Sequence, residues 1–578
     1  MPKADSPDCQ TWTVALGVVA PCAVVYLTLR PPLFDFDGYG YLLSALGPDR
    51  LGNIDHLHVL WEPIQIILVS LAGAAAPPPA FLFEIVGIVL NCAALFFFCV
   101  LLCKSSGSRL FAASATLFVA FSPRFWYLGF QNEPYPVLFL LLMLYLLSWS
   151  SFDEKTSNGL RLATGVFCLA AGILVHQAAV CFVPAGAITL IGFGSGTNLK
   201  RIARGVIWCG AIAALVLPVY TYIWTIVDSG SSFLSWTIED LSNQHPFRLE
   251  FPSTAIKAVI GVLGAIVQDG AVRPFLDRHF SPSEIFALYA AVGVSILLLT
   301  VILTWRSDLY SVSLRLIQTN PLFAVSVLSI VCWSLVVISY EPVTQNYWLV
   351  DILLAFIAVA LIIRDRKWSG VPSLSVALII LSAVNAWLNH ANDLEGSLNA
   401  PEHLVASIDR HVGKNDTFIV LADRDWYGDV EYELLFDYLR VSFDSRGIAI
   451  LNDFILPAKG SPLWRDRLRK KIDSTLRSCH RVFIAANVFD PHSYSDLAGT
   501  KDPFSPFVNQ EYVRIRGSEL MSQIVESFEP YQMVESSLRI GSDRYFAVTA
   551  RSTNPPSCRN QGEAIDEYRK TGTVGTLR

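Results

Sequence analysis

Between residues 11 and 390 the chain repeats apolar runs of 15 to 23 residues, and no other feature limits its fold so strongly. A bilayer core about 30 Å thick needs roughly 20 apolar residues in a helix to cross it. Charged residues make up only 16% of the 578 residues, whereas soluble domains carry about a quarter. The runs therefore predict a polytopic α-helical membrane protein. Residues 1–9 are polar and many runs follow the first, which is not typical of a secretory signal.

Eleven runs can serve as spans. They cover residues 11–29, 81–103, 108–123, 134–150, 159–175, 177–193, 204–226, 284–304, 320–340, 347–363 and 372–389. A twelfth run, 59–75, begins with Trp61, Glu62, Pro63 and Gln65, which leaves about 11 clean apolar residues, too few to cross unaided. We therefore expect about 11 spans plus one re-entrant or interfacial helix.

The basic residues of the connecting loops orient these spans. If 59–75 does not cross, the loops that hold most of the Lys and Arg all fall on one side, which the positive-inside rule makes cytoplasmic. The N-terminus is then cytoplasmic and the C-terminal region extracytoplasmic. Three further segments, 30–80, 124–133 and 227–283, share that outer face, and a weaker apolar run at 255–268 could lie in the interface. Long loops are uncommon unless they are functional, so the functional residues are expected on this face.

The sequence divides into a multi-span domain at 1–390, an extracytoplasmic α/β domain at 391–555 and a polar, disordered tail at 556–578. Strand-like pieces at 418–422, 447–451 and 481–486 alternate with helix-like ones, which predicts a small three-layer domain with a parallel core. Residues 423–429 follow the first of these strands, where they form either a solvated turn or a site that helps to bind an acceptor.

Cysteine usage points to no metal centre. Most of the 11 cysteines lie inside apolar runs, where they behave as small hydrophobic residues. Cys479 and Cys558 are the two in the C-terminal region, and either a disulfide between them or a pair of free thiols fits the sequence.

Two carboxylates, Asp35 and Asp37, follow the first span immediately, and Gly38 next to them lets a ligand approach the backbone. An acid at this depth is costly unless it faces water, a cation or a partner. The alternative is that either Asp caps a helix that begins near Tyr39.

Polar residues also gather at the outer ends of later spans. Arg124 could clamp a phosphate with two parallel hydrogen bonds, or extend its side chain to the lipid headgroups. Glu133, Tyr135, His176 and Gln345 share its face of the membrane. Asp351, about one turn inside a span, fits either a site or a helix–helix hydrogen bond.

Short motifs over residues 10–200 resemble the GT-C glycosyltransferases, in particular the protein O-mannosyltransferase-like branch. Phe121-Ser-Pro-Arg-Phe-Trp126 followed by Glu133-Pro-Tyr135 is similar to that branch's Phe-Ser-x-x-Phe-Trp and Glu-x-Tyr. Asp37-Gly38 stands where the branch has Asp-x-Gly-Glu, without the intervening residue and the Glu. The segment from His58 to Pro63 keeps the first and last residues of a His-Pro-rich element.

This resemblance implies an inverting transferase that takes a sugar from a polyprenyl-phosphate carrier and gives it to a glycan, lipid or protein acceptor on the extracytoplasmic face. The first-loop carboxylate, Asp37 with Asp35 beside it, is then the catalytic base, and Arg124 and His58 hold the departing phosphate. The candidates for contacting the substrate are Glu133, Tyr135, His176 and Gln345. No cofactor is required and no metal site is predicted, although Asp35, Asp37 and His58 could meet around a divalent ion.

Two other functions fit parts of the pattern. A transporter or flippase for a lipid-linked or polar substrate usually carries charges near mid-membrane and repeated halves, whereas here the polar residues collect at one face and no repeat is found. A scaffolding protein is the second alternative, and it would tolerate loss of Asp35 and Asp37. The formal charge of −6 offers no basic face for nucleic acid.

Overall fold

The computed structural model forms two units, one of residues Met1–Pro31 and Asp49–Gly396 and one of Pro32–Pro48 and Ser397–Arg578. The described residues are 9–29, 41–42, 45, 57–72, 79–150, 159–194, 196–227, 232–237, 253–266, 309–340, 342, 344–397, 416–420, 447–450, 463–485, 525–540 and 543–550. The predicted catalytic residues Asp35 and Asp37, the predicted span 284–304, segment 423–429 and the tail 556–578 lie outside them.

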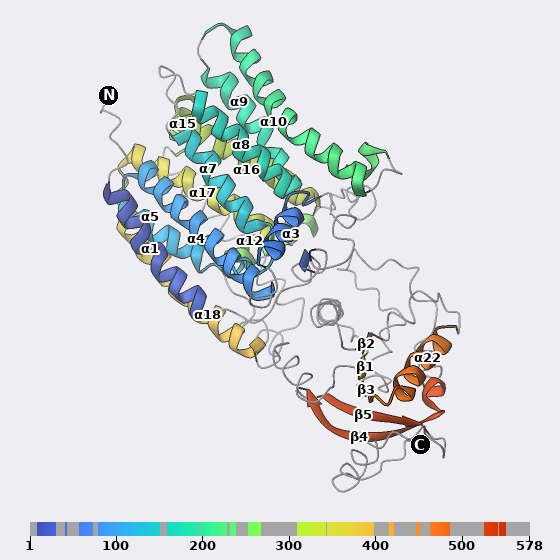
Figure 1. Ribbon diagram of the computed structural model, residues 1–578. Coiled ribbons are helices and arrows are strands. Elements are labelled where there is room, and N and C mark those ends of the chain that lie inside the picture. Colours follow the sequence, from blue (N-terminus) through green and yellow to red (C-terminus); the bar gives the residue numbers. More distant parts are fainter. Residues whose placement is uncertain are drawn as a thin grey trace. The chain divides into compact units, whose positions relative to one another are not determined.

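The first unit is a helical bundle of a membrane protein (Figure 1). The helices long and apolar enough to cross a bilayer are α1 (Cys9–Thr28), α4 (Pro79–Ser106), α10 (Asn198–Val227), α16 (Pro321–Tyr340), α17 (Gln345–Arg366) and α18 (Val371–Ser397). Shorter apolar helices are α3 (Trp61–Ala72), α5 (Arg109–Ala120), α7 (Tyr135–Ser150), α8 (Gly159–Val175), α9 (Phe182–Phe193) with the 3-10 turn η2 (Gln177–Cys181) before it, and α12 (Ser253–Ile266). Every predicted span within the described residues coincides with one of these helices.

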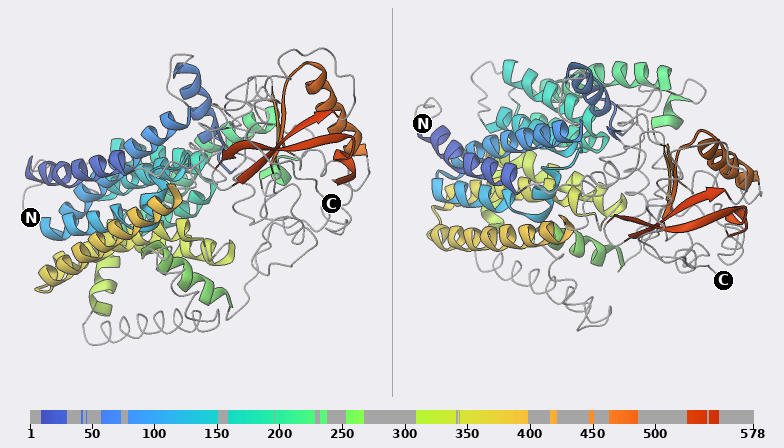
Figure 2. Two further views of the ribbon diagram at one scale, coloured as in Figure 1. Left: turned by 90° about the horizontal axis from the view of Figure 1, so that it is seen from below. Right: turned by 60° about the horizontal axis from the view of Figure 1, so that its bottom comes forward.

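Helix α4 is central in this bundle. It packs against α1, α5, α7 and α17, while α16 packs against α17 and α9 (Figures 1 and 2). Large apolar side chains remain exposed on the outer helices, for example Ile207 at 68% and Phe167 at 65%. Contiguous apolar surface of this kind is rare on soluble monomers, and lipid is the solvent that suits it.

Helix α3 occupies the run that we predicted not to cross. Its 12 residues extend about 18 Å, well short of the bilayer core. It buries Glu62 and Gln65 and exposes Ile67 and Leu71, so its polar side faces protein and its apolar side faces outward. Helix α5, which coincides with a predicted span, is also 12 residues long, so the re-entrant or interfacial position of α3 stays a prediction.

The second unit contains a five-stranded sheet of order β2-β1-β3-β5-β4. Strands β1 (Thr417–Val420), β2 (Gly447–Ile450) and β3 (Val482–Ala485) fall on the three predicted strands and pair in parallel. A hairpin of β4 (Tyr531–Ile540) and β5 (Asp543–Ala550), which we did not predict, adds to β3 in antiparallel fashion. The sheet is therefore mixed, and the predicted three layers stay a prediction because most connecting segments lie outside the described residues.

Helix α22 (Leu463–Arg477) belongs to the same unit and buries Leu468 and Ile472. Asp416, just before β1, binds Arg481, just before β3. Its Oδ1 accepts from the Arg481 backbone N–H at 2.8 Å, and its Oδ2 accepts from the Arg481 guanidinium at 2.8 and 3.0 Å. Between helix and strand, Cys479 adopts a left-handed φ of 59° and is disulfide-bonded. Cys479 is therefore not a free thiol, and its predicted pairing with Cys558 stays a prediction because Cys558 lies outside the described residues.

Candidate functional site

Two segments far apart in the sequence meet at the C-terminal end of α8. The Leu60 N–H donates to the Leu174 carbonyl at 2.9 Å, and the Gln177 N–H donates to the Leu57 carbonyl at 3.0 Å. The chain needs these bonds because the break between α8 and η2 leaves backbone groups without helical partners. The start of α3 is thereby fixed to the α8–η2 junction.

This junction brings His58 and His176 together. Their ring centroids lie 5.0 Å apart at an interplanar angle of 78°. His58 Nδ1 lies 3.1 Å from the Val175 carbonyl, 117 residues away in sequence. Both imidazoles are buried. Two of the predicted site residues are therefore in contact inside the bundle.

Aromatic rings enclose the His176 imidazole. The Tyr135 hydroxyl lies 3.3 Å from His176 Nε2, and the Tyr347 and Trp333 ring centroids lie 6.1 and 6.3 Å from that of His176. Trp333 Nε1 donates to the Tyr347 carbonyl at 2.7 Å, which fixes both rings. His176 Nδ1 is buried and has no hydrogen-bond partner among the described residues. A buried polar atom without a partner is uncommon in folded proteins, so His176 Nδ1 is a candidate to contact a ligand.

The loop between α6 (Pro123–Leu128) and α7 is held against α4 by close backbone contact. A Cβ at Gly87 would lie 2.9 Å from the Gly129 carbonyl, so glycine is required for this approach. Asn91 Nδ2, one turn further along α4, donates to the Phe125 carbonyl at 3.2 Å. These contacts fix the loop that leads to the predicted residues Glu133 and Tyr135.

Three consecutive polar side chains in this loop are buried. Gln131, Asn132 and Glu133 are 2%, 1% and 3% exposed, and Asn132 Nδ2 donates to Gln65 Oε1 at 3.2 Å. Burial of so many polar groups is costly unless each has a partner. Gln65 and Asn132 were not among the predicted site residues, although a Gln inside an apolar run was a signal that pointed to one.

Arg124 and Gln345 form a pair on the same face of the bundle. Arg124 Nε donates to Gln345 Oε1 at 2.6 Å, and its guanidinium carbon lies 5.2 Å from the Tyr127 ring centroid. The guanidinium is half-buried, and its two Nη groups have no partner among the described residues. At Gly264 of α12 an added Cβ would overlap the Gln345 amide, so α12 packs directly over this pair.

The structure thus joins the predicted residues into two groups, His58 with His176 and Tyr135, and Arg124 with Gln345. Glu133 is buried two residues before Tyr135. Asp351 Oδ2 accepts from Ser334 Oγ at 2.9 Å, as the helix–helix alternative predicted. Among the described residues no three His, Cys, Asp or Glu side chains are placed to hold a metal ion.

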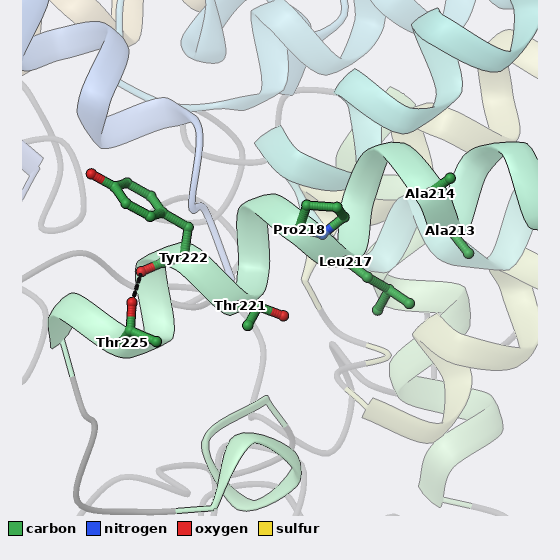
Figure 3. Close-up of a pocket in the computed structure, with 7 residues that line it drawn as sticks. All are labelled: Ala213, Ala214, Leu217, Pro218, Thr221, Tyr222 and Thr225. Carbon is green, nitrogen blue, oxygen red and sulfur yellow. Dashed lines mark hydrogen bonds between the residues drawn. The ribbon is translucent and has the colours of Figure 1, made fainter.

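A hollow of about 610 Å³ lies elsewhere, on one side of α10 (Figure 3). It is lined by Ala213, Ala214, Leu217, Pro218, Thr221, Tyr222 and Thr225. Pro218 has no N–H to donate to the Ala214 carbonyl, which opens the helix at this point. None of the predicted site residues lines this hollow.

No protein-family profile matches the sequence, and no curated protein matches it either. Among solved structures, the Pmt1–Pmt2 protein O-mannosyltransferase of S. cerevisiae bound to its sugar donor is 12% identical, with a TM-score of 0.31 over 38% of this chain and 34% of that chain. The chain thus spans about a third of that protein. The oligosaccharyltransferase AglB of Archaeoglobus fulgidus, in complex with an inhibitory peptide and a dolichol-phosphate, is 11% identical with a TM-score of 0.45 over 94% of this chain and 75% of that chain.

ArnT of Cupriavidus metallidurans bound to undecaprenyl phosphate is 11% identical, with a TM-score of 0.49 over 95% of this chain and 100% of that chain. Identities and TM-scores at these levels assign no activity, so the function proposed below rests on the residues of the site. The solved structures that this chain is similar to thus include a protein O-mannosyltransferase, an oligosaccharyltransferase and ArnT.

Proposed function

We propose that the chain is an integral membrane glycosyltransferase, which moves a sugar from a polyprenyl-phosphate donor to an acceptor at the extracytoplasmic membrane boundary. The observation that carries this proposal is the Arg124–Gln345 pair. Gln345 engages Nε, which leaves both Nη groups of a half-buried guanidinium for another ligand. A fixed guanidinium with a free edge matches the two oxygens of a phosphate.

The reaction divides into two parts that different residues serve. The acceptor hydroxyl attacks the anomeric carbon, its proton passes to Asp37, and the bond from that carbon to the phosphate oxygen breaks with inversion. The leaving phosphate keeps the electron pair, so a cation aids it more than a general acid does. We assign that cation to Arg124, with His58 as the second candidate for holding the phosphate, while the roles of Asp37 and Asp35 follow from the resemblance.

The aromatic group around His176 is a suitable wall for a sugar. Tyr135 and Tyr347 present apolar rings with hydroxyl edges, and both rings lie beside the His176 imidazole and beside each other. Glu133 precedes Tyr135 and can accept hydrogen bonds from sugar hydroxyls. Because Gln345 Oε1 is already engaged, we assign Gln345 to orienting Arg124 before any contact with the substrate.

The extracytoplasmic location has independent support in the second unit. Disulfides persist in oxidising compartments and are rare in the cytosol, and Cys479 is disulfide-bonded. The positive-inside distribution of Lys and Arg places the same region outside.

The proposal is tested with the purified full-length chain in proteoliposomes and a panel of polyprenyl-phosphate sugars. Replacing Arg124→Gln should lower transfer by roughly 100-fold or more, the cost typical of losing one charge-stabilising donor. Arg124→Lys keeps the charge but loses the two parallel N–H donors of the guanidinium, so an intermediate loss of transfer is expected. Arg315→Gln is the matched control, because Arg315 pairs with Asp365 far from this site. Transfer that is unaffected by Arg124→Gln would contradict the proposal.

A transporter is the second candidate, and Asp351 favours it. This carboxyl is buried inside α17, and its Oδ1 has no hydrogen-bond partner among the described residues. Ionisable groups inside spans commonly mark transport pathways. Movement of an intact lipid-linked or polar substrate across the proteoliposome membrane, without transfer of sugar, would favour the transporter.

A further inference from the structure

Helix α22 of the second unit concentrates positive charge. Its 15 residues include six Lys or Arg and two Asp, hence a net charge of +4, whereas the whole chain has a formal charge of −6. A run of basic residues is often only a solvated helix face. The partners of each basic side chain show which residues are free to bind something else.

Three of the six bases have partners, two of them outside the helix and one within it. Arg465 pairs with Glu526 at 2.6 Å, Arg469 donates to the backbone carbonyls of Glu526 and Ser527, and Arg477 lies 3.7 Å from Asp473. The Tyr531 hydroxyl also donates to Asp473 Oδ1, at 2.7 Å. Burial and the neighbouring Asp473 carboxylate raise the pKa of this hydroxyl, so it remains a donor.

The other three bases, Arg467, Lys470 and Lys471, are exposed and form no ion pair or hydrogen bond with the described residues. Their spacing of i, i+3 and i+4 places them side by side on one face of the helix. That face lies away from the buried Leu468 and Ile472. We call Arg467, Lys470 and Lys471 the basic face of α22.

We propose that the basic face of α22 docks on the anionic phospholipid headgroups of the membrane that the chain spans. The charges are complementary, and two of the three side chains are lysines, whose flexible point charges suit a diffuse surface better than a shaped pocket. Only 18 residues separate Ser397, the end of α18, from Asp416 at the first strand. Fully extended, they reach at most about 65 Å, so the bilayer is present at a high effective concentration.

The size of the effect follows from the number of free charges. Each Lys or Arg near an anionic membrane surface contributes roughly a factor of five, so three together favour the docked form on the order of 100-fold. Salt at 1 M shortens the screening length to about 3 Å and should abolish most of this preference. The inference does not depend on the proposed transferase activity.

The test uses the full-length chain with Ser474→Cys carrying a fluorophore, because Ser474 is exposed one turn beyond Lys470 and Lys471. The chain is placed in nanodiscs of neutral phosphatidylcholine or of phosphatidylcholine with 30% phosphatidylglycerol, each containing headgroup-quencher lipid. The same labelling reaction on the unsubstituted chain gives the background from native cysteines. We expect strong quenching only in the anionic discs, reversed by 1 M salt.

Two triple variants separate charge from structure. R467Q/K470Q/K471Q should lose quenching in the anionic discs, whereas R467K/K470R/K471R should retain it. Equal quenching in neutral and anionic discs, or none in either, would overturn the proposal. Binding of a soluble polyanionic peptide that R467Q/K470Q/K471Q abolishes, without quenching in the anionic discs, would also overturn it, because the face would then bind an anionic polymer.

Discussion

Arg124 is oriented by Gln345, and the two residues are 221 positions apart in sequence. Gln345→Leu removes the acceptor of the Nε hydrogen bond and should raise the donor KM by about 10- to 100-fold, the worth of a hydrogen bond to a charged group. Gln345→Asn keeps an amide acceptor without adding a charge and should raise the donor KM less. Steady-state kinetics with a polyprenyl-phosphate sugar measures both, and equal KM values for the two variants would show that Gln345 does not orient Arg124.

His176 and Tyr135 should act as one unit because the Tyr135 hydroxyl lies 3.3 Å from His176 Nε2. His176→Phe keeps a planar ring in the cluster, and Tyr135→Phe removes only the hydroxyl. We predict that each lowers transfer about 10-fold and that the double variant is hardly worse than either single one. Transfer rates of all four proteins form the cycle, with thermal unfolding as the control for folding. Losses that multiply in the double variant would refute the coupling.

For single residues, the sequence alone predicted which polar side chains lie at the membrane boundary but not which partners they contact. Arg124, Tyr135 and His176 stand out because charge or hydrogen-bonding capacity at the end of an apolar run is costly without a purpose. Trp333 and Tyr347 do not stand out, since an aromatic residue in a span is equally expected in packing or in the interfacial belt. Their contacts with His176 arise from tertiary packing, which no local pattern encodes.

Helix α12 shows how a short element can control a site residue in another helix. Its Gly264 leaves room for the Gln345 amide, and Asn385 of α18 donates to the carbonyl of Ile266, the last residue of α12, at 2.8 Å. The sequence predicted an interfacial run at this place, but the contact with Gln345 depends on glycine at one position.

Gly264→Ala should push the Gln345 amide aside and thereby lower transfer by about 10-fold, although Ala is the better helix former by about 1 kcal/mol. Gly210→Ala in α10 is the matched control, because an added Cβ there meets nothing within 4 Å. Transfer assays and unfolding temperatures for both variants test this. If the two variants behave alike, α12 does not act on the site through Gln345.

The β4–β5 hairpin is the element that sequence reasoning missed. Residues 531–540 mix polar and apolar side chains without strict alternation, and a register shift between Glu535 and Arg539 interrupts the pairing. The Gly541-Ser542 pair between the strands was a usable hairpin signal. By contrast, the three parallel strands were found because short β-branched runs alternated with helix-like segments.

For the whole molecule, the apolar runs predicted the helical unit because the length of a span is set by the bilayer itself. The side of the membrane depends on weaker evidence, the loop charges and one disulfide. We predict that Cys479 in the isolated full-length chain resists thiol alkylation until a reductant is added. Peptide mass spectrometry measures this directly. Alkylation of Cys479 without reductant would show that its thiol is free, and the disulfide would then give no support for an oxidising compartment.

In the proposed function, Arg124 and Asp37 serve the transfer of a sugar from a lipid phosphate to an acceptor. Its most direct test counts products in proteoliposomes that hold the chain, a radiolabelled polyprenyl-phosphate sugar and candidate acceptors. We expect one polyprenyl phosphate to be released for each sugar attached, at a rate that Arg124→Gln reduces roughly 100-fold and Arg315→Gln leaves unchanged. Donor that stays intact with every acceptor, or crosses the membrane intact, would contradict it.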